Sequence, residues 1–249
     1  MNYYIPVLLI LIIFIFGFFK TKHINETFDN LNSIDMYVIT LGKEERLNNI
    51  KNQQKKIDNK IKIFNGINGI QLDVNDLLKK NILAKDYKLS KNYNHAKREM
   101  GCYLSHLNIY LQIKEDNKKG YTVIFEDDFI INSDNLIDDI KKAIDTLDNK
   151  NIDFDFLFLG NSTDNKGLHI VDNLYEVNEN KELYGLYGYL INNKNIDKII
   201  DKTKQIDRPI DVIIQDLSYI NEFKTIIMYP HLIKHTWSFK STVNNKEPV

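Results

Sequence analysis

Three adjacent carboxylates, Glu126, Asp127 and Asp128, end a short apolar run that begins at Tyr121. The run is rich in β-branched and aromatic residues and follows a glycine, which predicts a strand buried on both faces. A buried charge must be paired with an opposite charge or bound to a cation. Because ligands of α/β proteins bind beyond the carboxyl ends of the strands, the triplet is a candidate site for a divalent cation that bridges phosphates. The alternative interpretation is a loop start whose acids are solvated or cap the next helix.

The composition places these acids in a chain that is long enough to bury a sizeable core. With 249 residues, one α/β domain of about 200 residues is the simplest organisation. The formal net charge of -1 provides no electrostatic footprint for nucleic acid, so we expect no nucleic-acid partner. Cys102 is the only cysteine, which excludes an intramolecular disulfide.

Residues 1–22 are predicted to be a hydrophobic membrane anchor. Residues 3–19 carry no charge and would form a helix of roughly 25 Å, at the short end of a bilayer span. No basic segment or small-residue cleavage site accompanies them, so we expect an uncleaved single-pass anchor. Lys20 and Lys22 favour a cytosolic location of the following domain, but the charge difference is small and leaves the side of the membrane open. Residues 23–33 are polar and are expected to form a stem.

Residues 34–249 are expected to form one α/β domain with a mainly parallel central sheet. The domain opens with strand, helix and strand in alternation, which is typical of a βαβ unit. The expected strands are 36–41, 61–64, the apolar run 121–125, 153–160, 184–191 and 224–228. The expected helices are 43–56, 72–83, 98–117, a helix capped by Ser133 or Asp134, 195–204, and one that begins near Pro209.

The helix expected at 98–117 is apolar on two faces and should therefore be buried on both. One face carries Met100, Tyr103, Leu104, Leu107 and Leu111, and the other carries Cys102, Ile109 and Ile113. Gly101 costs a helix roughly 1 kcal/mol relative to alanine, so we expect another segment to pack against the backbone there. His106 lies among the apolar positions and is interpreted either as a hydrogen-bonded interior histidine or as a substrate contact.

Five sequence blocks occur in an order and at distances that match one known family. They are residues 37–41 (YVITL) with Arg46 downstream, 64–69 (FNGING), 99–106 (EMGCYLSH), 125–128 (FEDD), and 187–191 (YGYLI) followed by 209–211 (PID) and 230–233 (PHLI). Together they resemble glycosyltransferase family 25, which includes bacterial lipooligosaccharide galactosyltransferases and collagen hydroxylysine galactosyltransferases. One departure is Thr40, where the family more often has asparagine.

The resemblance implies a GT-A-like nucleotide-sugar-binding fold in residues 34–249. It also implies a metal-dependent, inverting transfer of a sugar, with galactose favoured, from a UDP-sugar donor. The acceptor would be a hydroxyl group on a glycan, a lipid-linked saccharide such as lipooligosaccharide, or a hydroxylysine-type protein side chain. The implied cofactor is Mn²⁺, which neutralises charge on the departing UDP.

Site residues follow from the resemblance, position by position. Asp128 and Glu126 are the expected Mn²⁺ ligands. Asp211 is the expected general base, which must reach the acceptor hydroxyl; the alternative is an acid that only favours the dipole of its helix. His231 or His235 is a hypothetical further metal ligand. The expected nucleotide-sugar contacts are Thr40, Arg46, Asn68, Ser105, His106, Asp127 and Gly188.

Two other classes of function stay open at this point. The first is a catalytically inactive relative that binds a nucleotide sugar or glycan, although the intact acidic triplet and Asp211 argue against it. The second is a metal-dependent phosphohydrolase that uses the same carboxylates. The sequence contains no clustered His/Asp metal motif that supports the second class.

Overall fold

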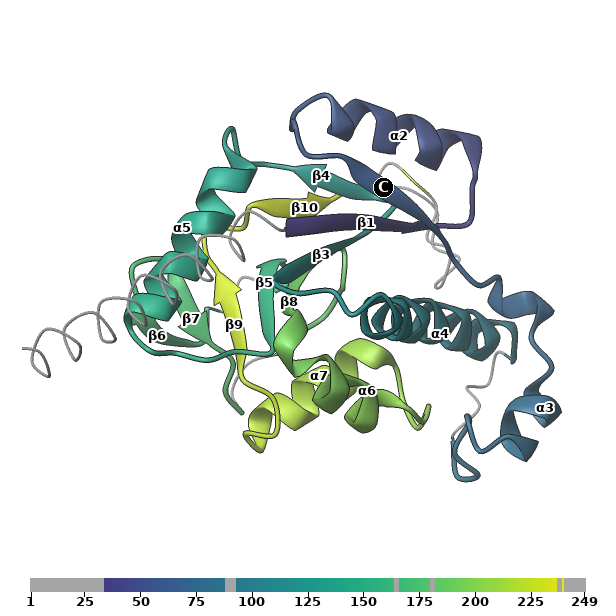
Figure 1. The fold of residues 1–249 in the computed structure, drawn as a ribbon. Helices are drawn as coiled ribbons and strands as arrows, with labels where there is room; N and C mark the ends of the chain where they lie inside the picture. Colours follow the sequence, from purple (N-terminus) through teal and green to yellow (C-terminus); the bar gives the residue numbers. More distant parts are fainter. Residues whose placement is uncertain (1–33, 88–92, 164–165, 180–181, 237–238, 240–249) are drawn as a thin grey trace, which may run out of the picture.

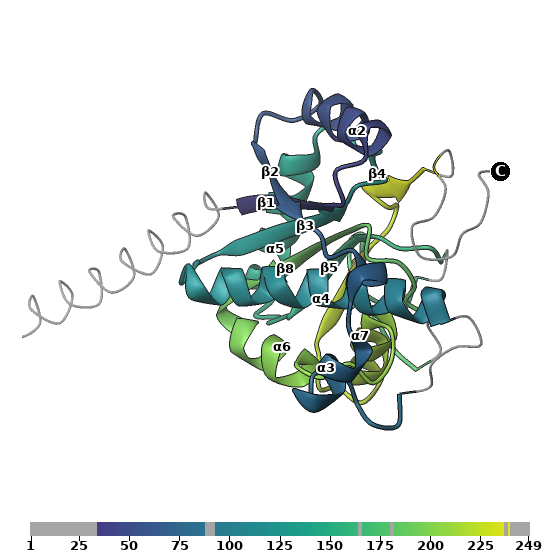
Figure 2. The ribbon, with the colours of Figure 1, turned by 90° about the vertical axis from the view of Figure 1, so that its right-hand side faces the viewer.

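A computed structural model describes residues 34–87, 93–163, 166–179, 182–236 and 239. These residues form a mixed α/β structure with helices on both faces of an eight-stranded sheet (Figures 1 and 2). The predicted anchor (1–22) and stem (23–33) lie outside the described residues. Within the described ranges, no helix combines the length and apolar character needed to cross a membrane.

The elements agree in type and order with most of those expected from the sequence. The helices are α2 (Glu44–Gln54), α3 (Val74–Lys79), α4 (Tyr93–Glu115), α5 (Leu136–Asn149), α6 (Ile196–Thr203) and α7 (Ile210–Tyr219), with 3-10 turns at Gly69–Gln71 and Asn193–Asn195. The strands are β1 (Ile34–Thr40), β2 (Ile61–Asn65), β3 (Tyr121–Glu126), β4 (Phe129–Ile131), β5 (Phe156–Gly160), β6 (Leu168–Val171), β7 (Leu174–Glu176), β8 (Gly188–Asn192), β9 (Thr225–Met228) and β10 (Ile233–His235).

Most strands of the large sheet run in one direction. The strand order is β2-β1-β3-β8-β5-β9-β7-β6, and β10 pairs with β4 in a separate two-stranded sheet. β1 is parallel to β2 and β3, and β5 is parallel to β9. β8 is antiparallel to β3 and β5, and β7 is antiparallel to β9 and β6. The predicted parallel βαβ start is therefore confirmed, and only β8 and β7 run against the other strands of this sheet.

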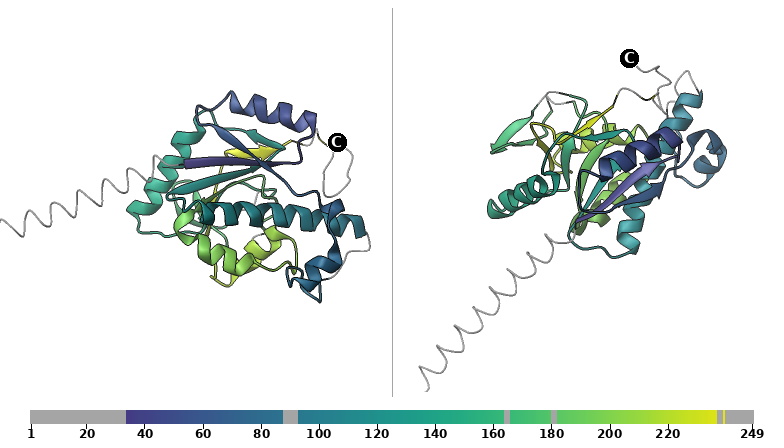
Figure 3. Two further views of the ribbon diagram at one scale, coloured as in Figure 1. Left: turned by 45° about the vertical axis from the view of Figure 1, so that its right-hand side comes forward. Right: turned by 90° about the horizontal axis from the view of Figure 1, so that it is seen from above.

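The sheet separates two apolar cores. One core joins the sheet to α4, α6 and α7 and includes Ile124 of β3. The other joins it to α2, α5, β4 and β10 and includes Val123 and Phe125. Figure 3 shows α2 and α4 on opposite sides of the sheet. Successive side chains of a strand point to opposite faces. By the same alternation, Glu126 lies on the α4 side of the sheet and Asp127 on the α2 side.

Gly101 of α4 lies against another segment, as its position in a helix predicted. A Cβ atom at Gly101 would lie 2.5 Å from the backbone nitrogen of Gly69, and a Cβ at Gly69 would lie 1.9 Å from the carbonyl oxygen of Lys97. Neither distance leaves room for a side chain. The loop after β2 is therefore pressed directly onto the backbone of α4.

Two local predictions were wrong. Leu111 of α4 is 44% exposed, so this end of the helix is not buried on the expected face. The N-cap of α5 is Asn135, not Ser133 or Asp134. The Ser133 hydroxyl instead accepts a hydrogen bond from the Asn135 amide and donates one to Asp139, and this local turn moves the start of the helix towards the C-terminus.

Candidate functional site

The acidic triplet lies at the edge of the sheet where the parallel strands β1, β2 and β3 end. In the sheet register, Ile39 of β1 lies opposite Glu126, and Thr40 lies opposite Asn65 at the end of β2. The carboxyl ends of parallel strands are the usual ligand crevice of an α/β sheet. Burial raises the pKa of both Asp128 and Asp211, and the charge of Glu126 adds to each shift, so the predicted metal ligands and the predicted base are close enough to interact.

On the α2 side, a buried guanidinium holds two of the three acids. Nη1 of Arg46 lies 3.0 Å from Oδ1 of Asp127 and 2.9 Å from Oδ2 of Asp128. Arg46 is only 1% exposed, and its guanidinium carbon lies 4.7 Å from the ring centroid of Phe239. The Thr40 hydroxyl donates a 2.7 Å hydrogen bond to Oδ2 of Asp127. Arg46, Thr40 and Asp127 were predicted as nucleotide-sugar contacts, and the structure brings them together in one ion-paired group.

Two amides of α2 fix the backbone of the same turn, and the sequence reasoning missed both. Nδ2 of Asn49 donates 3.0 Å hydrogen bonds to the carbonyl oxygens of Asp127 and Phe129. Oε1 of Gln53 accepts a 3.0 Å hydrogen bond from the amide of Ile131. The i, i+4 spacing of two amides beside the inward-facing Ile50 was the available signal.

Asp128 has the electrostatic character of a cation ligand. Its pKa is raised to about 6, first by burial and then by the charge of Glu126, although Arg46 opposes the shift. Its Oδ1 atom is buried and accepts no hydrogen bond within the described part of the chain. An orphaned carboxylate oxygen is costly. A hard divalent cation would supply the missing partner, so the residues present fit the expected Mn²⁺.

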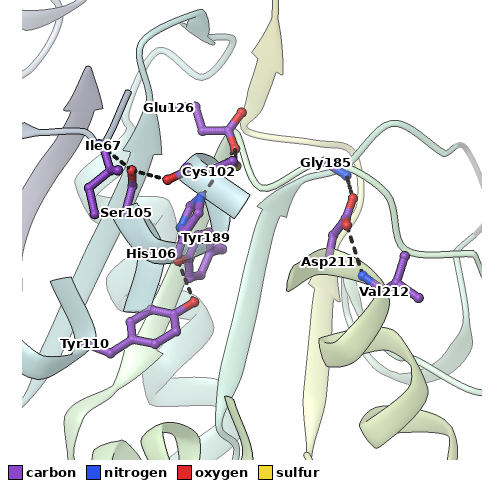
Figure 4. Close-up of polar contacts among 11 residues, drawn as sticks. Ile67, Cys102, Ser105, His106, Tyr110, Glu126, Gly185, Tyr189, Asp211 and Val212 are labelled. Atoms are coloured by element: carbon purple, nitrogen blue, oxygen red, sulfur yellow. Dashed lines mark hydrogen bonds and ion pairs between the residues drawn. The ribbon is translucent and has the colours of Figure 1, made fainter. Parts of the chain in front are cut away.

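Asp211 sits in the first turn of α7, where its carboxylate accepts two backbone hydrogen bonds. Oδ2 accepts from the amide of Gly185 at 3.2 Å, and Oδ1 accepts from the amide of Val212 at 3.0 Å (Figure 4). Burial raises the pKa of Asp211, and the two hydrogen bonds oppose that shift. Asp211 therefore lies in the first turn of its helix, as the alternative interpretation predicted. Its carboxylate also interacts electrostatically with Glu126.

On the α4 side, a chain of hydrogen bonds leads from Glu126 into the core (Figure 4). His106 of α4 is fully buried, and its Nε2 lies 3.3 Å from Oε1 of Glu126. Its Nδ1 lies 2.7 Å from the hydroxyl of Tyr189 on β8, which lies 2.8 Å from the hydroxyl of Tyr110. His106 is thus an interior, hydrogen-bonded histidine that also contacts a predicted metal ligand. Neither tyrosine was singled out from the sequence.

Three of the predicted nucleotide-sugar contacts have local structural roles. The Ser105 hydroxyl donates to the carbonyl of Gly101 at 2.6 Å and accepts from the amide of Ile67 at 2.8 Å, which ties α4 to the loop after β2. Asn68 is exposed and caps the turn Gly69–Gln71. A Cβ at Gly188 would lie 2.6 Å from Cγ2 of Ile233, so the lack of a side chain at Gly188 lets β10 pack against β8. Ligand contacts by these residues stay predictions.

The two histidines proposed for the metal shell differ in position. The ring nitrogens of His231 lie 3.0 Å from the carbonyl oxygen of Met228 and 3.3 Å from that of Thr163. His235 packs its ring 4.8 Å from that of Tyr187. Burial lowers the pKa of His235 while the charge of Glu126 opposes that shift, so His235 is the histidine that lies near the acids.

The model of glycosyltransferase family 25, described as an LPS biosynthesis protein, matches residues 33–214. A search of curated proteins finds no match. The crystal structure of A197 from STIV matches with 13% sequence identity and a TM-score of 0.40, over 86% of this chain and 91% of that chain.

A second solved structure is the apo form of the glycosyltransferase GlyE from Streptococcus pneumoniae TIGR4. It matches with 13% identity and a TM-score of 0.36, over 78% of this chain and 45% of that chain. The assignment depends on the family model, which covers well over half of the sequence. The resemblance seen in the five sequence blocks is confirmed, and the chain belongs to glycosyltransferase family 25.

Proposed function

We propose that this family member is a metal-dependent, inverting glycosyltransferase with a GT-A-like donor site. The family implies a nucleotide-sugar donor and a glycan acceptor. The finer proposal is a UDP-sugar donor, with galactose favoured, and a hydroxyl acceptor on a glycan, lipooligosaccharide or hydroxylysine-type side chain. The observation that carries metal dependence is the buried Oδ1 of Asp128, which accepts no hydrogen bond within the described residues and lies in the field of Glu126.

Asp128 and Glu126 are the residues that would hold Mn²⁺, and bound Mn²⁺ would stabilise the negative charge of the UDP leaving group. Arg46 forms ion pairs with Asp127 and Asp128 from the α2 side. Glu126, Asp127, Asp128 and Asp211 carry four negative charges at this edge when all are ionised, which exceeds the single charge of that guanidinium. A divalent cation would balance much of the excess.

Asp211 is the proposed general base. In an inverting transfer, the base takes the proton of the acceptor hydroxyl as that oxygen attacks the sugar carbon. The raised pKa of Asp211 makes its carboxylate a stronger proton acceptor than a solvated aspartate. The amides of Gly185 and Val212 orient the two oxygens, so the position of the group does not depend on side-chain contacts alone.

We also propose that residues 1–22 anchor the enzyme to a membrane. β1 begins at Ile34 and runs towards the acidic edge, so the chain enters the domain at the opposite end of the sheet. An anchor attached there would leave the catalytic edge facing away from the point of attachment. Extraction of the full chain from membranes by detergent but not by alkaline carbonate is the expected result, and carbonate extraction would contradict the anchor.

The decisive experiment measures UDP release by the purified full chain across a panel of UDP-sugars, with and without Mn²⁺. We expect metal-dependent turnover of one donor. Asp128→Ala should lower kcat by about 10²- to 10³-fold, because loss of a metal contact removes several kcal/mol of transition-state stabilisation. Asp138→Ala, at an exposed position in the first turn of α5, is the matched control and should retain activity.

The other outcomes each overturn a part of the proposal. Tight UDP–Mn²⁺ binding without turnover of any donor, with acceptor saccharides present, would identify a binding relative instead of an enzyme. If neither added Mn²⁺ nor a chelator changes the rate of turnover, the activity does not depend on a metal ion. Failure to bind UDP at all would reject the UDP-sugar donor.

A further inference from the structure

Cys102, His106 and Glu126 bring three different ligand atoms together at the acidic edge (Figure 4). Cys102 and His106 lie one helical turn apart on α4, and both face the end of β3. The Cys102 thiol donates to Oε1 of Glu126 at 3.9 Å, and Nε2 of His106 lies 3.3 Å from the same oxygen. All three ligand atoms lie within 4.8 Å of one another. The i, i+4 spacing of Cys102 and His106 was the sequence signal for this group.

We propose that Cys102, His106 and Glu126 form a three-ligand site for a borderline divalent cation such as Zn²⁺. Zinc binds thiolate, imidazole and carboxylate at bond lengths that place the ligand atoms of one tetrahedral ion roughly 3.4–3.6 Å apart. The two separations that involve Glu126, 3.3 and 3.9 Å, bracket that range, and the thiol and the imidazole nitrogen lie within 4.8 Å of each other. Three protein ligands and an open fourth position are typical of zinc sites that exchange or activate a bound molecule.

The surroundings of His106 favour a metal ligand. Zinc-bound histidines usually hydrogen-bond through their other ring nitrogen, which fixes the ring and the tautomer. Here Nδ1 contacts the hydroxyl of Tyr189, and that hydroxyl contacts Tyr110. The proton therefore belongs on Nδ1 when Nε2 binds a cation, and the ring already points Nε2 at Glu126.

The charge balance also favours a cation. Burial raises the pKa of the Cys102 thiol, and the charges of Glu126, Asp211 and Asp128 raise it further. When Zn²⁺ binds, the sulfur–proton bond breaks, the proton passes to solvent and the sulfur lone pair bonds to the metal. The surrounding carboxylates then stabilise the bound cation instead of opposing the thiolate.

This site differs in ligand chemistry from the proposed Mn²⁺ site. Thiolate and imidazole select zinc-like ions, whereas oxygen ligands such as Asp128 suit Mn²⁺. The two sites share Glu126, so an ion bound at one would compete for that carboxylate with an ion at the other. The proposal concerns binding of the metal alone and stands whether or not the protein transfers a sugar.

The first test titrates the full chain with Co²⁺ in the absence of donor and acceptor. We expect one equivalent to bind with a thiolate-to-cobalt charge-transfer band, which Zn²⁺ then removes. Cys102→Ser should abolish the band, and His106→Gln should weaken binding. Tyr189→Phe should weaken binding by about 10- to 100-fold, the usual cost of losing the partner of a metal-bound histidine. His169→Gln, at an exposed position on β6, is the control and should bind normally.

The second test uses only the unmodified protein, so it does not depend on the folding of any variant. Cys102 is the sole cysteine of the chain, so alkylation reports one thiol. Stoichiometric Zn²⁺ should slow that alkylation, and the same concentration of Mn²⁺ should slow it much less. Unchanged alkylation with Zn²⁺, or a cobalt complex without a thiolate band, would reject the site.

Discussion

The two sides of the turn after β3 place neighbouring carboxylates in opposite chemical settings. On the α2 side, Asp127 and Asp128 share the permanent charge of the buried Arg46. On the α4 side, Glu126 contacts His106 and Cys102, two groups whose charge depends on whether they hold a proton. The alternation of side chains along a strand separates the two settings by a single residue.

The difference indicates how one acidic triplet serves both the fold and a ligand. A guanidinium cannot lose its proton in a protein, so Arg46 keeps its positive charge at any working pH. The imidazole and thiol can exchange protons for a metal ion, so the α4 side can respond to a ligand. We therefore expect substitution of Arg46 to act mainly on stability, and substitution of Glu126, Asp128 or Asp211 to act mainly on binding and catalysis.

Asp211→Asn should have the largest effect and should act on activity. The amide cannot accept the acceptor's proton, so kcat should fall by about 10²- to 10⁴-fold. Asparagine offers one acceptor oxygen for the two amides that Asp211 binds, so the free energy of unfolding should fall by only about 1 kcal/mol. Steady-state UDP release and urea denaturation measure the two effects. A kcat within threefold of the unmodified enzyme would exclude Asp211 as the base.

Arg46→Met should have the next largest effect, and it should act on stability. Removing the guanidinium leaves Asp127 and Asp128 without their ion-pair partner, which typically costs about 3–5 kcal/mol in a buried site. Urea denaturation measures the change. Lys51→Met, at an exposed position on the same helix, is the control and should change stability by less than about 0.5 kcal/mol. Equal stability of both variants would refute the structural role of Arg46.

The sequence predicted the acids and their place in the sheet, because both depend on local patterns. Successive side chains in the apolar run from Tyr121 are buried alternately in the two cores, and the acids follow at its carboxyl end. The partners of those acids depend on tertiary packing. Arg46 lies 81 positions before Asp127, and sequence spacing alone cannot distinguish an ion pair from the nucleotide-sugar contact that the resemblance implied. The structure was needed to show the ion pair, and the nucleotide-sugar contact of Arg46 stays a prediction.

The order and direction of the strands were also only partly predictable from the sequence. Strand, helix and strand at the start of the domain predicted parallel pairing of β1 and β2, which was correct. The insertion of β8 between β3 and β5, antiparallel to both, follows from no local pattern. Gly160 and Gly188 allow this centre of the sheet to lie against β10, since a Cβ at Gly160 would lie 1.9 Å from the carbonyl oxygen of Ile233. The sequence showed the glycines but not the strand that packs against them.

Mn²⁺ should stabilise the protein in a pH-dependent way. The pKa of Asp128 is about 6, so its carboxyl is ionised at pH 7.5 and largely protonated at pH 5. A concentration of Mn²⁺ equal to 100 times the Kd at pH 7.5 should add about 2.7 kcal/mol to the free energy of unfolding. The bound proton at pH 5 should weaken Mn²⁺ binding by about tenfold, which removes about 1.4 kcal/mol of that gain.

Without a metal ion, the stability of the protein should change with pH in the opposite direction. A carboxyl whose pKa is raised on folding stabilises the folded state less as the pH rises from its ordinary pKa to about 6. Thermal melts at pH 5 and 7.5, with and without Mn²⁺, measure both trends. Asp128→Asn should reduce both, because it removes the titrating group. A gain from Mn²⁺ that is equal at the two pH values would place the metal on groups other than Asp128.

Tyr189→Phe should have the smallest effect and tests whether hydrogen bonds hold the α4 side. The substitution removes the hydroxyl that lies between Nδ1 of His106 and the hydroxyl of Tyr110. Both remaining groups are buried, so the free energy of unfolding should fall by about 1–3 kcal/mol. Tyr93→Phe, at a half-exposed position at the start of α4, should cost less than about 0.5 kcal/mol. If the two variants unfold alike in urea, packing alone orients His106, and the α4 side owes its geometry to its apolar neighbours instead of its polar ones.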